Sequence, residues 1–301
     1  MANSILSARV LQNEAAAIAW VESRVWPHGP VCPHCGGVER IGRMGGKATR
    51  IGLWKCYQCR KQFTVKVGTV FEDSHVPMNL WLQAMYLLCS SKKGISSNQL
   101  SRTLGVTLKT AWFMAHRIRE AMRVVGMEPM GGAGETVEVD ETFIGRQEGQ
   151  PKRRAGYGHK NTVLTLVQRG GSARSFHVDS VRVADIAPVI RENLKRESAM
   201  MTDEGTYYHQ VGKEFASHEM VNHSADEYVR GVAHTNTVEG YFSIFKRGMK
   251  GVYQHCHEKH LHRYLAEFDF RYSNRVRLGV DDVERTARAV KGIVGKRLTY
   301  R

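Results

Sequence analysis

Four of the six cysteines lie in two pairs with the spacing of a metal site. Cys32 pairs with Cys35 and Cys56 with Cys59, and 20 residues separate the two pairs. Four thiolates complete a tetrahedral shell around Zn²⁺, so such an ion holds a fold together and performs no chemistry. The glycine pair 36–37 permits a tight turn after the first cysteine pair. We therefore expect a structural zinc ion bound by all four thiolates, with two disulfides or a redox pair as the alternative.

Three carboxylates farther along the chain have the residue types of a divalent-metal site. Asp140 lies inside a strand rich in β-branched residues, Asp203 follows a short strand, and Glu239 lies near the start of a helix. Mg²⁺ and Mn²⁺ take oxygen ligands, and two ions ~3.5–4 Å apart stabilise the attacking and leaving oxygens of a phosphodiester. The structural alternative is a strand-edge acid, a turn acid and a helix-capping acid that share no role.

Neighbouring acids compete for two of these positions. Strand alternation places Glu138 on the face of Asp140 and Glu141 on the opposite face. Asp140 is therefore preferred over Glu141 only if its own face borders the site. Glu204 is the nearest rival of Asp203.

The helix expected after Glu239 has two distinct faces. Helical spacing places Glu239, Lys246 and Lys250 on one face, whereas Val238 and Phe242 lie on an apolar face. Ammonium groups next to a metal carboxylate are well placed to hold a DNA phosphate.

Hydrophobic periodicity predicts the elements that must position these residues. Helices are expected over 5–25, 77–90, 96–104, 107–123, 183–194, 236–250 and 259–272. Strands are expected over 63–67, 136–144, 161–168, 174–178 and 199–202. The order strand, hairpin, helix, strand and helices after residue 135 is that of a ribonuclease-H-like α/β domain, although other mixed folds share it.

The helices over 96–104 and 107–123 have the pattern of a helix-turn-helix. Ser96 followed by Gln99 predicts a helix start, and the second helix carries positive charge from Lys109, Arg117 and Arg119. A recognition helix in the DNA major groove requires this combination, so these three residues are predicted to bind nucleic acid, as is Lys250. An ordinary helical hairpin is the alternative.

The composition agrees with a DNA-binding protein. The chain of 301 residues has a net charge of +15, and residues 1–125 hold 17 basic and only 6 acidic side chains. Basic surfaces attract polyanions because they release counterions from phosphates, although a solvated basic surface is the alternative. No apolar run approaches the ~18 residues of a membrane span. The first thirty residues lack a signal pattern, so we expect a cytoplasmic protein without a membrane partner.

Three sequence segments resemble the DDE transposases of bacterial insertion sequences. They are Val-Glu-Val-Asp-Glu-Thr-Phe-Ile-Gly at Asp140, Thr-Asp-Glu-Gly-Thr-Tyr-Tyr at Asp203 and Asn-Thr-Val-Glu-Gly-Tyr-Phe-Ser-Ile-Phe-Lys-Arg-Gly at Glu239. Together with Cys-Pro-His-Cys-Gly and Lys-Thr-Ala-Trp-Phe-Met, they are similar to the ISXO-like group, which has an N-terminal zinc ribbon. The likeness runs from about residue 20 to about residue 275.

The resemblance implies a ribonuclease-H-like catalytic domain and transposition dependent on Mg²⁺ or Mn²⁺. It assigns catalytic roles to Asp140, Asp203 and Glu239 and a supporting role to Lys246. Asn occupies the third catalytic position in parts of this group, so Asn236 shares or replaces the role of Glu239 in an alternative assignment. We prefer Glu239, because an ionised oxygen is the better ligand for a hard cation.

The sequence and the resemblance together define an expected organisation. It is an N-terminal helix (1–30), zinc ribbon (31–72), helix-turn-helix (76–125), linker (126–134), DDE domain (135–274) and basic C-terminal tail (275–301). The expected partner is double-stranded DNA, as terminal inverted repeats and as target, bound by at least a homodimer because two ends must be paired. Two other functions stay open: a non-catalytic DNA-binding regulator, and a metal-dependent nuclease that joins no ends.

Overall fold

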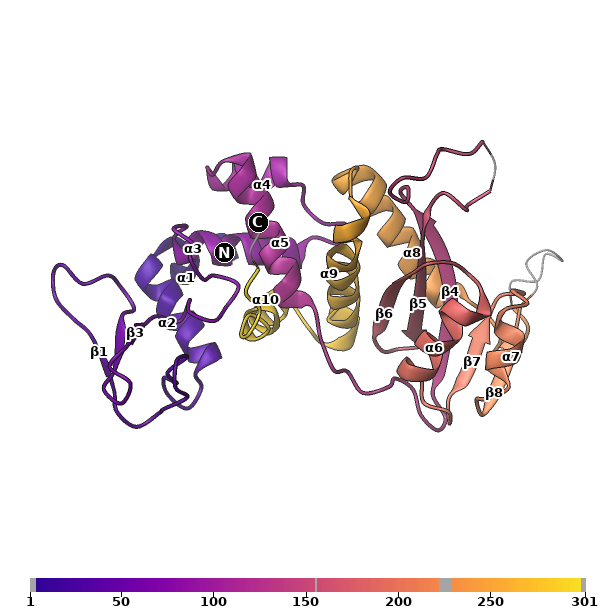
Figure 1. Cartoon of the computed structure of the whole chain (residues 1–301), viewed down its shortest axis with the longest axis horizontal. Coiled ribbons are helices and arrows are strands. Elements are labelled where there is room, and N and C mark those ends of the chain that lie inside the picture. The colour runs from indigo at the N-terminus through magenta and orange to yellow at the C-terminus, as the bar shows by residue number, and fades with distance from the viewer. Residues whose placement is uncertain (1–3, 155, 222–228, 299–301) are drawn as a thin grey trace. The chain divides into compact units, whose positions relative to one another are not determined.

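The computed structural model describes residues 4–154, 156–221 and 229–298, which fall into two compact units (Figure 1). The first unit comprises Met1–Ser91, Ile95–Arg123 and Asp281–Arg301. The second unit comprises Lys92–Gly94 and Val124–Val280. None of the helices that the structure describes combines the length and the apolarity needed to span a lipid bilayer.

The first unit begins with three short helical segments rather than one helix. They are a 3₁₀ turn (η1, Ile5–Ser7), α1 (Arg9–Gln12) and α2 (Glu14–Val25). The single helix predicted over 5–25 is therefore wrong, and Asn13 is the reason. Its backbone is extended, and its side chain accepts a 2.9 Å hydrogen bond from Ala16 N, which caps a new helix.

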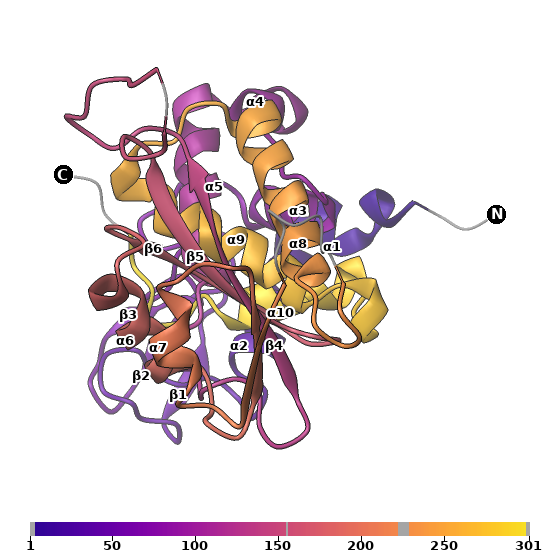
Figure 2. The same cartoon turned by 90° about the vertical axis from the view of Figure 1, so that its right-hand side faces the viewer.

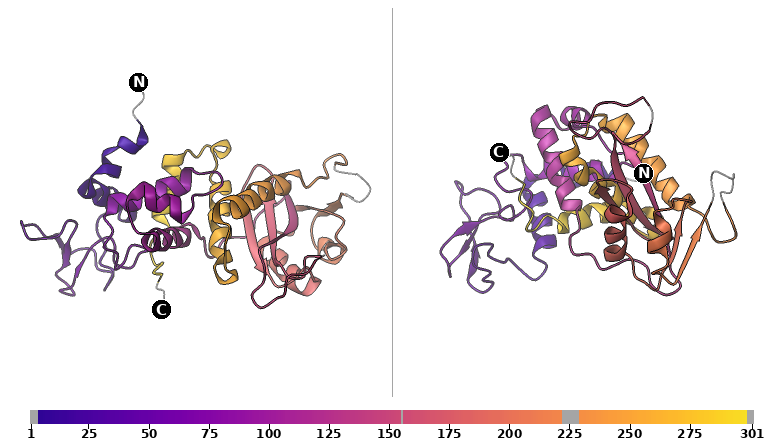
Figure 3. Two further views of the ribbon diagram at one scale, coloured as in Figure 1. Left: turned by 90° about the horizontal axis from the view of Figure 1, so that it is seen from above. Right: turned by 45° about the vertical axis from the view of Figure 1, so that its right-hand side comes forward.

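The second cysteine pair begins at the end of a small antiparallel sheet with the strand order β1-β2-β3, and Cys56 is the last residue of β2. The sheet is part of the N-terminal segment in Figure 1 and Figure 3. Its strands are β1 (Ile41–Arg43), β2 (Trp54–Cys56) and β3 (Gln62–Phe63). The strand predicted over 63–67 is wrong beyond Phe63. Phe63 and Val65 are both buried, which mimics strand alternation, but Val67 N donates to Thr64 O at 3.1 Å and closes a turn.

The predicted helices of the first unit follow the ribbon. They are α3 (Met78–Ser90), α4 (Ser97–Leu104) and α5 (Leu108–Met122). Ser96 and Thr107 cap the last two, each accepting a 3.1 Å hydrogen bond from a backbone N–H three residues on. Gly105 ends α4 at a φ of 65°, which glycine adopts without strain. Sequence reasoning thus located both helices of the pair.

Residues 275–298 are folded, so the basic tail predicted over 275–301 is wrong for the part of it that the structure describes. The segment contains a 3₁₀ turn (η5, Val276–Leu278) and α10 (Asp282–Lys291), which packs against α2, α3 and α5 of the first unit. Ala289, Val290 and Ile293 are fully buried, whereas Arg288 and Lys291 face solvent. The numerous charges of this segment conceal its narrow apolar stripe, and this is why it was predicted as a basic tail.

The second unit is built on a five-stranded mixed sheet with the order β6-β5-β4-β7-β8 (Figure 1). The strands are β4 (Thr136–Ile144), β5 (Asn161–Gln168), β6 (Ala173–Val178), β7 (Ala199–Thr202) and β8 (Ser217–Met220). β4, β5 and β6 are antiparallel neighbours, whereas β4, β7 and β8 run parallel. This sheet confirms the expected α/β class and is consistent with a ribonuclease-H-like fold. The sequence did not indicate β8.

Helices cover both faces of this sheet (Figure 1, Figure 2). One face packs on α6 (Val183–Asn193) and α7 (Tyr208–Gly212). The other packs on α8 (Asn236–Gly248), a π-helical turn (η3, Met249–Tyr253) and α9 (Leu261–Ser273), which follows a 3₁₀ turn (η4, Glu258–His260). Val137 and Val139 of β4 face α6 and α7. Because side chains alternate along a strand, Glu138 and Asp140 face α8.

Candidate active site and zinc site

The four cysteine sulfurs of the ribbon have the geometry of a tetrahedral zinc site. Their Sγ atoms lie within 4.8 Å of one another, with 3.6 Å between Cys32 and Cys59 and 3.7 Å between Cys35 and Cys56. A tetrahedron with Zn–S bonds of about 2.3 Å has sulfur–sulfur edges of about 3.8 Å, whereas a disulfide requires about 2.05 Å. The residues therefore fit a structural zinc ion, and none of the cysteines is in a disulfide.

Backbone turns present these sulfurs. Gly36 has a φ of 72°, and its N–H donates to Cys32 O at 2.9 Å, which closes the turn predicted from the glycine pair. Arg60 adopts a φ of 64° at the corresponding place after the second pair. The N–H groups of Cys59 and Gln58 lower the pKa of the Cys56 thiol to about 7. The N–H of Gly37 lowers the pKa of the Cys35 thiol, but burial and the neighbouring sulfurs together raise it to about 12.

In the second unit, the structure brings together the carboxylates of Asp140, Glu141 and Asp203. One oxygen of each lies within 4.8 Å of the others. Asp203 reaches this position because β7 runs parallel to β4 with Met201 opposite Glu138, so the residue after β7 lies level with Asp140. In the described part of the chain, the pairing of β4 with β7 ends at Glu138, two residues before Asp140.

Glu141 joins the group although its backbone position faces α7. Its two carboxylate oxygens accept hydrogen bonds from the hydroxyls of Tyr207 (2.5 Å) and Tyr208 (2.7 Å). Burial raises the pKa of Glu141, and the two hydroxyl contacts oppose that shift. Sequence reasoning set Glu141 aside because strand alternation turned it away from Asp140. The consecutive tyrosines 207–208, close after Asp203, were the only signal for its position.

The group favours a bound cation for electrostatic reasons. Burial raises the pKa of Asp140 well above its ordinary value, and the negative charges of Glu141 and Asp203 raise it further. Backbone N–H groups hold the side chains in place: Glu141 N donates to Asp140 Oδ1 at 2.7 Å, and Gly205 N donates to Asp203 Oδ1 at 3.0 Å. Three close carboxylates with oxygen-only donor atoms fit a hard divalent cation.

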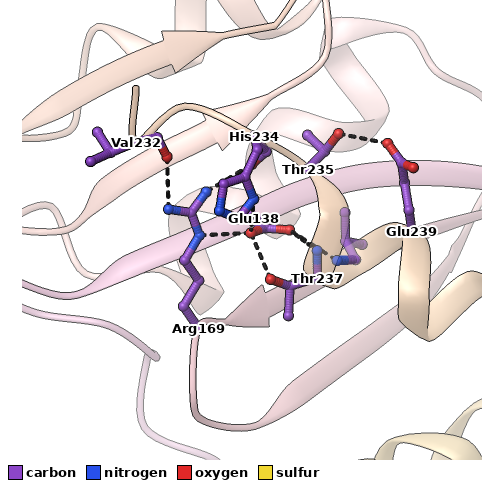
Figure 4. A network of polar contacts seen from close by, with 8 residues as sticks. Glu138, Arg169, Val232, His234, Thr235, Thr237 and Glu239 are labelled. Carbon is purple, nitrogen blue, oxygen red and sulfur yellow. Dashed lines mark hydrogen bonds and ion pairs between the residues drawn. The ribbon is translucent and has the colours of Figure 1, made fainter. Parts of the chain in front are cut away.

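Glu239 lies in the first turn of α8 (Figure 4) and is not among the three clustered carboxylates. Its side chain is exposed, and its Oε1 accepts a 2.9 Å hydrogen bond from the Thr235 hydroxyl. Its negative charge also contributes to the raised pKa of Asp140, after burial and the nearer carboxylates. Asn236 is the first residue of α8 and is exposed. The helix-capping alternative for Glu239 does not hold, because Thr235 occupies the cap position and Glu138 accepts from the free N–H groups.

The lysine face of α8 borders the carboxylates. Burial lowers the pKa of the Lys246 ammonium, and the negative charge of Asp140 opposes that shift. Lys250 lies in the π-helical turn after α8 and is exposed. Val238 and Phe242 are buried in the core under the sheet, as the helical spacing predicted. The structure thus places an ammonium group within electrostatic range of Asp140.

Only one of the three charged residues predicted to bind DNA from α5 is exposed. Lys109 lies in the first turn and faces solvent. Arg117 is 4% exposed and Arg119 is 1% exposed. Arg117 donates to the carbonyl oxygens of Val70 (2.7 Å) and Glu72 (2.6 Å), so it ties α5 to the segment after the ribbon. These two arginines are therefore placed as interior residues, contrary to the nucleic-acid-binding role expected from their charge.

Comparison with known proteins gives consistent matches. Residues 132–273 match the ISXO2-like transposase domain, and residues 12–62 match a transposase zinc-ribbon domain. An uncharacterized protein in transposable element ISH50 of Halobacterium salinarum is 27% identical over 264 residues. That similarity covers 82% of this chain and 86% of the relative. The matched segments contain the four clustered cysteines and the clustered carboxylates.

Proposed function

Because this chain belongs to the family of ISXO2-like transposases, we propose that it binds the terminal repeats of an insertion sequence and catalyses DNA cleavage and strand transfer. The observation that carries the proposal is the group of three carboxylates, Asp140, Glu141 and Asp203. Such a site suits a phosphodiester reaction, in which negative charge must be neutralised at the transferred phosphorus.

The reaction has two steps, and in each of them one phosphorus atom is attacked. In the first, water adds to the phosphorus at the element end, and the 3′ oxygen of the element leaves as a hydroxyl. In the second, that 3′-hydroxyl attacks a target phosphodiester, forms a new P–O bond and displaces the 3′ oxygen of the target strand. Both steps are in-line displacements, so they depend on positioning and charge neutralisation.

Asp140, Asp203 and one of Glu141 or Glu239 would hold the divalent cation, Mg²⁺ or Mn²⁺. When bound, such ions lower the pKa of water and neutralise charge on the leaving oxygen. The contribution of the chain is to fix the ligands: β4 carries Asp140, the end of β7 carries Asp203, and the first turn of α8 carries Glu239. The three elements belong to one compact unit, so their spacing is set by its core.

Lys246 and Lys250 follow Glu239 along α8 and its π-helical end, and we assign them contacts to DNA phosphates. Lys109 stands at the exposed start of α5, the end of a recognition helix that reads base edges in helix-turn-helix proteins. The zinc ribbon belongs to the same compact unit as α4 and α5. We assign to this unit the binding of the terminal repeats, with at least a dimer pairing two ends.

A two-plasmid transposition assay tests the proposal. A selectable marker is flanked by the DNA found on either side of the gene, and the wild type is compared with Asp203→Ala. Joined products are expected with the wild type and a loss of at least about 100-fold with the variant, because a charge that acts on the transition state is removed. Asp179→Ala, at an exposed acid between β6 and α6, is the matched control and is expected to retain joining.

The other outcomes separate the remaining functions. Cut ends without joined products would identify a nuclease. Binding to the flanks with neither cutting nor joining, unchanged by Asp203→Ala, would identify a DNA-binding regulator. Either result overturns the proposed strand transfer.

A further inference from the structure

Glu138 is a buried carboxylate outside the group of three. It lies on β4 two residues before Asp140 and on the same face, and it is 0% exposed. Figure 4 shows its carboxylate at the centre of a polar network that reaches α8. A buried charge destabilises the folded protein unless donors surround it, so the identity of its partners shows what it holds.

Its partners on one side belong to the first turn of α8. Glu138 Oε2 accepts hydrogen bonds from the backbone N–H groups of Thr237 (2.7 Å) and Val238 (2.9 Å), and Oε1 accepts from the Thr237 hydroxyl (2.8 Å). These N–H groups have no partner within a helix, and the side chain at the cap position normally accepts from them. Here Thr235 holds that position, but its hydroxyl donates to Glu239. The sheet therefore caps the helix.

On the other side, Arg169 connects the same carboxylate to the segment that leads into α8. Arg169 lies in the turn after β5, and its Nε donates to Glu138 Oε1 at 2.7 Å. Its two terminal nitrogens donate to the carbonyl oxygens of Val232 and His234, both at 2.8 Å. His234 Nδ1 lies 3.1 Å from Glu138 Oε1. The backbone before α8 and the start of α8 are thus both attached to the sheet at one point.

We propose that Glu138 is a positioning residue that fixes Glu239 relative to Asp140, and this inference rests on the proposed function. Glu138 and Asp140 share a strand, and residues two apart on one face are about 7 Å apart. Thr237 and Glu239 share the first turn of α8, and Thr235 orients the Glu239 carboxylate. Among the described residues, the Glu138 contacts are the hydrogen bonds between that turn and β4, so we expect the distance between the two acids to depend on them.

Glu138→Gln tests the inference because it keeps the size of the side chain and removes its charge. The glutamine NH₂ group is a donor, so it must face one of the donors from α8 or Arg169. Hydrogen exchange of peptides covering the start of α8 is expected to become faster. Mn²⁺ affinity, measured on the full chain with the metal alone, is expected to fall about 10–100-fold, as for partners that orient metal ligands. Glu192→Gln, at an exposed glutamate of α6, is the control and should change neither readout.

A double-mutant cycle distinguishes positioning from a general loss of structure. If Glu138 acts through Glu239, then Glu138→Gln should weaken Mn²⁺ binding less than about 2-fold in a Glu239→Gln background. Additive effects would overturn the inference, because they would mean that Glu138 acts independently of Glu239. Thr237→Val, which removes only one hydroxyl contact, should give a smaller effect of the same kind and covers the case that Glu138→Gln does not fold.

Activity is recorded separately. With the terminal DNA as substrate, Glu138→Gln should lower kcat for strand transfer more than it raises KM, since Lys109 belongs to the other compact unit. A wild-type protein that binds Mn²⁺ but joins no ends would refute the proposed function. The positioning role of Glu138 would still be decided by the hydrogen-exchange and Mn²⁺-binding measurements. Unchanged exchange at the start of α8 in Glu138→Gln would overturn it.

Discussion

Asp140 carries an electrostatic cost in the metal-free protein. Burial and the charges of Glu141 and Asp203 raise its pKa in the folded state, so the folded state binds the proton of Asp140 more tightly than the unfolded state does. The contribution of Asp140 to stability is therefore fully present below its unfolded-state pKa and is lost as the pH rises through its raised folded-state pKa. A divalent cation reverses this cost, because it favours the ionised form.

Asp140→Asn is accordingly expected to abolish strand transfer. It is also expected to stabilise the protein at pH values above the ordinary pKa of an aspartate. We expect a gain of about 0.5–2 kcal/mol at pH 8 in buffer without Mg²⁺ or Mn²⁺. Thermal unfolding at pH 4.5 and pH 8 measures it, and the gain should be larger at pH 8. Mg²⁺ should raise the Tm of the wild type but not that of Asp140→Asn. A variant less stable than the wild type at pH 8 would contradict this account, and Asp179→Asn controls for the loss of a charge.

At this scale the sequence predicted residues whose chemistry depends on type and spacing, and it failed where tertiary contacts decide. The two cysteine pairs form one cluster in the structure, and the acids Asp140 and Asp203 belong to another. Glu141 was missed because its position depends on two tyrosines more than 60 residues away in sequence. Arg117 was expected to bind DNA because it is a charged residue of the second helix of the pair. It is instead buried and donates to carbonyl groups 47 and 45 residues away in sequence.

At the scale of the elements, the zinc ribbon has a small apolar core of its own. Its core consists of Cys32, Cys56 and Phe63, with Trp26 and Trp54 among the side chains packed against it. Its longest strands have three residues. So small an element requires a metal to remain folded, because zinc binding contributes about 10–16 kcal/mol in zinc-finger peptides.

Cys59→Ser is expected to remove the zinc and unfold the ribbon. Metal analysis should give one zinc per chain for the wild type and a value near zero for the variant. Because Trp26 and Trp54 lie at 6.3 Å between ring centroids in the ribbon core, their emission should also shift to the red. Cys256→Ser is the matched control, since Cys256 lies outside the group of four. Equal zinc content in Cys59→Ser and the wild type would refute the Cys₄ assignment.

The strands with a pronounced pattern in the sequence were predicted with correct bounds, and the strand without one was missed. Residues 136–144 and 161–168 were predicted with the bounds of β4 and β5, because both strands have long β-branched runs. β8 (Ser217–Met220) lacks such a pattern, and among the described strands it pairs with β7 through its backbone. β8 forms because it pairs with the free side of β7, and the residues of β8 themselves do not indicate that pairing.

For the whole molecule, the main departure from the predicted organisation is that the chain returns to its first unit. Residues 281–301 pass back from the second unit, and Arg285 Nη1 donates to Cys89 O at 2.9 Å. Lys296 Nζ also donates to Ala121 O at 3.3 Å. A prediction that places domains one after another along the chain misses this arrangement. The first unit is completed by contacts between residues nearly 200 positions apart in sequence.

The closure of the first unit can be tested at Gly292, which follows α10. A Cβ atom at Gly292 would lie 2.2 Å from the carbonyl oxygen of Ala121, a backbone atom of α5. Gly292→Ala should therefore destabilise the first unit by about 1–3 kcal/mol, the usual effect of overpacking. Gly45→Ala, where no atom lies within 4 Å of the added Cβ, is the matched control.

The tryptophans make this measurement specific to one unit, because all five lie in the first: Trp20, Trp26, Trp54, Trp81 and Trp112. In Gly292→Ala, the unfolding transition followed by tryptophan emission should move down by several degrees. Terminal-DNA binding at that temperature should fall with it. Mn²⁺ affinity should not change, because the carboxylates belong to the second unit. If Gly292→Ala instead lowered Mn²⁺ affinity and left the tryptophan transition in place, α10 would stabilise the catalytic unit rather than the unit that we assign to DNA binding.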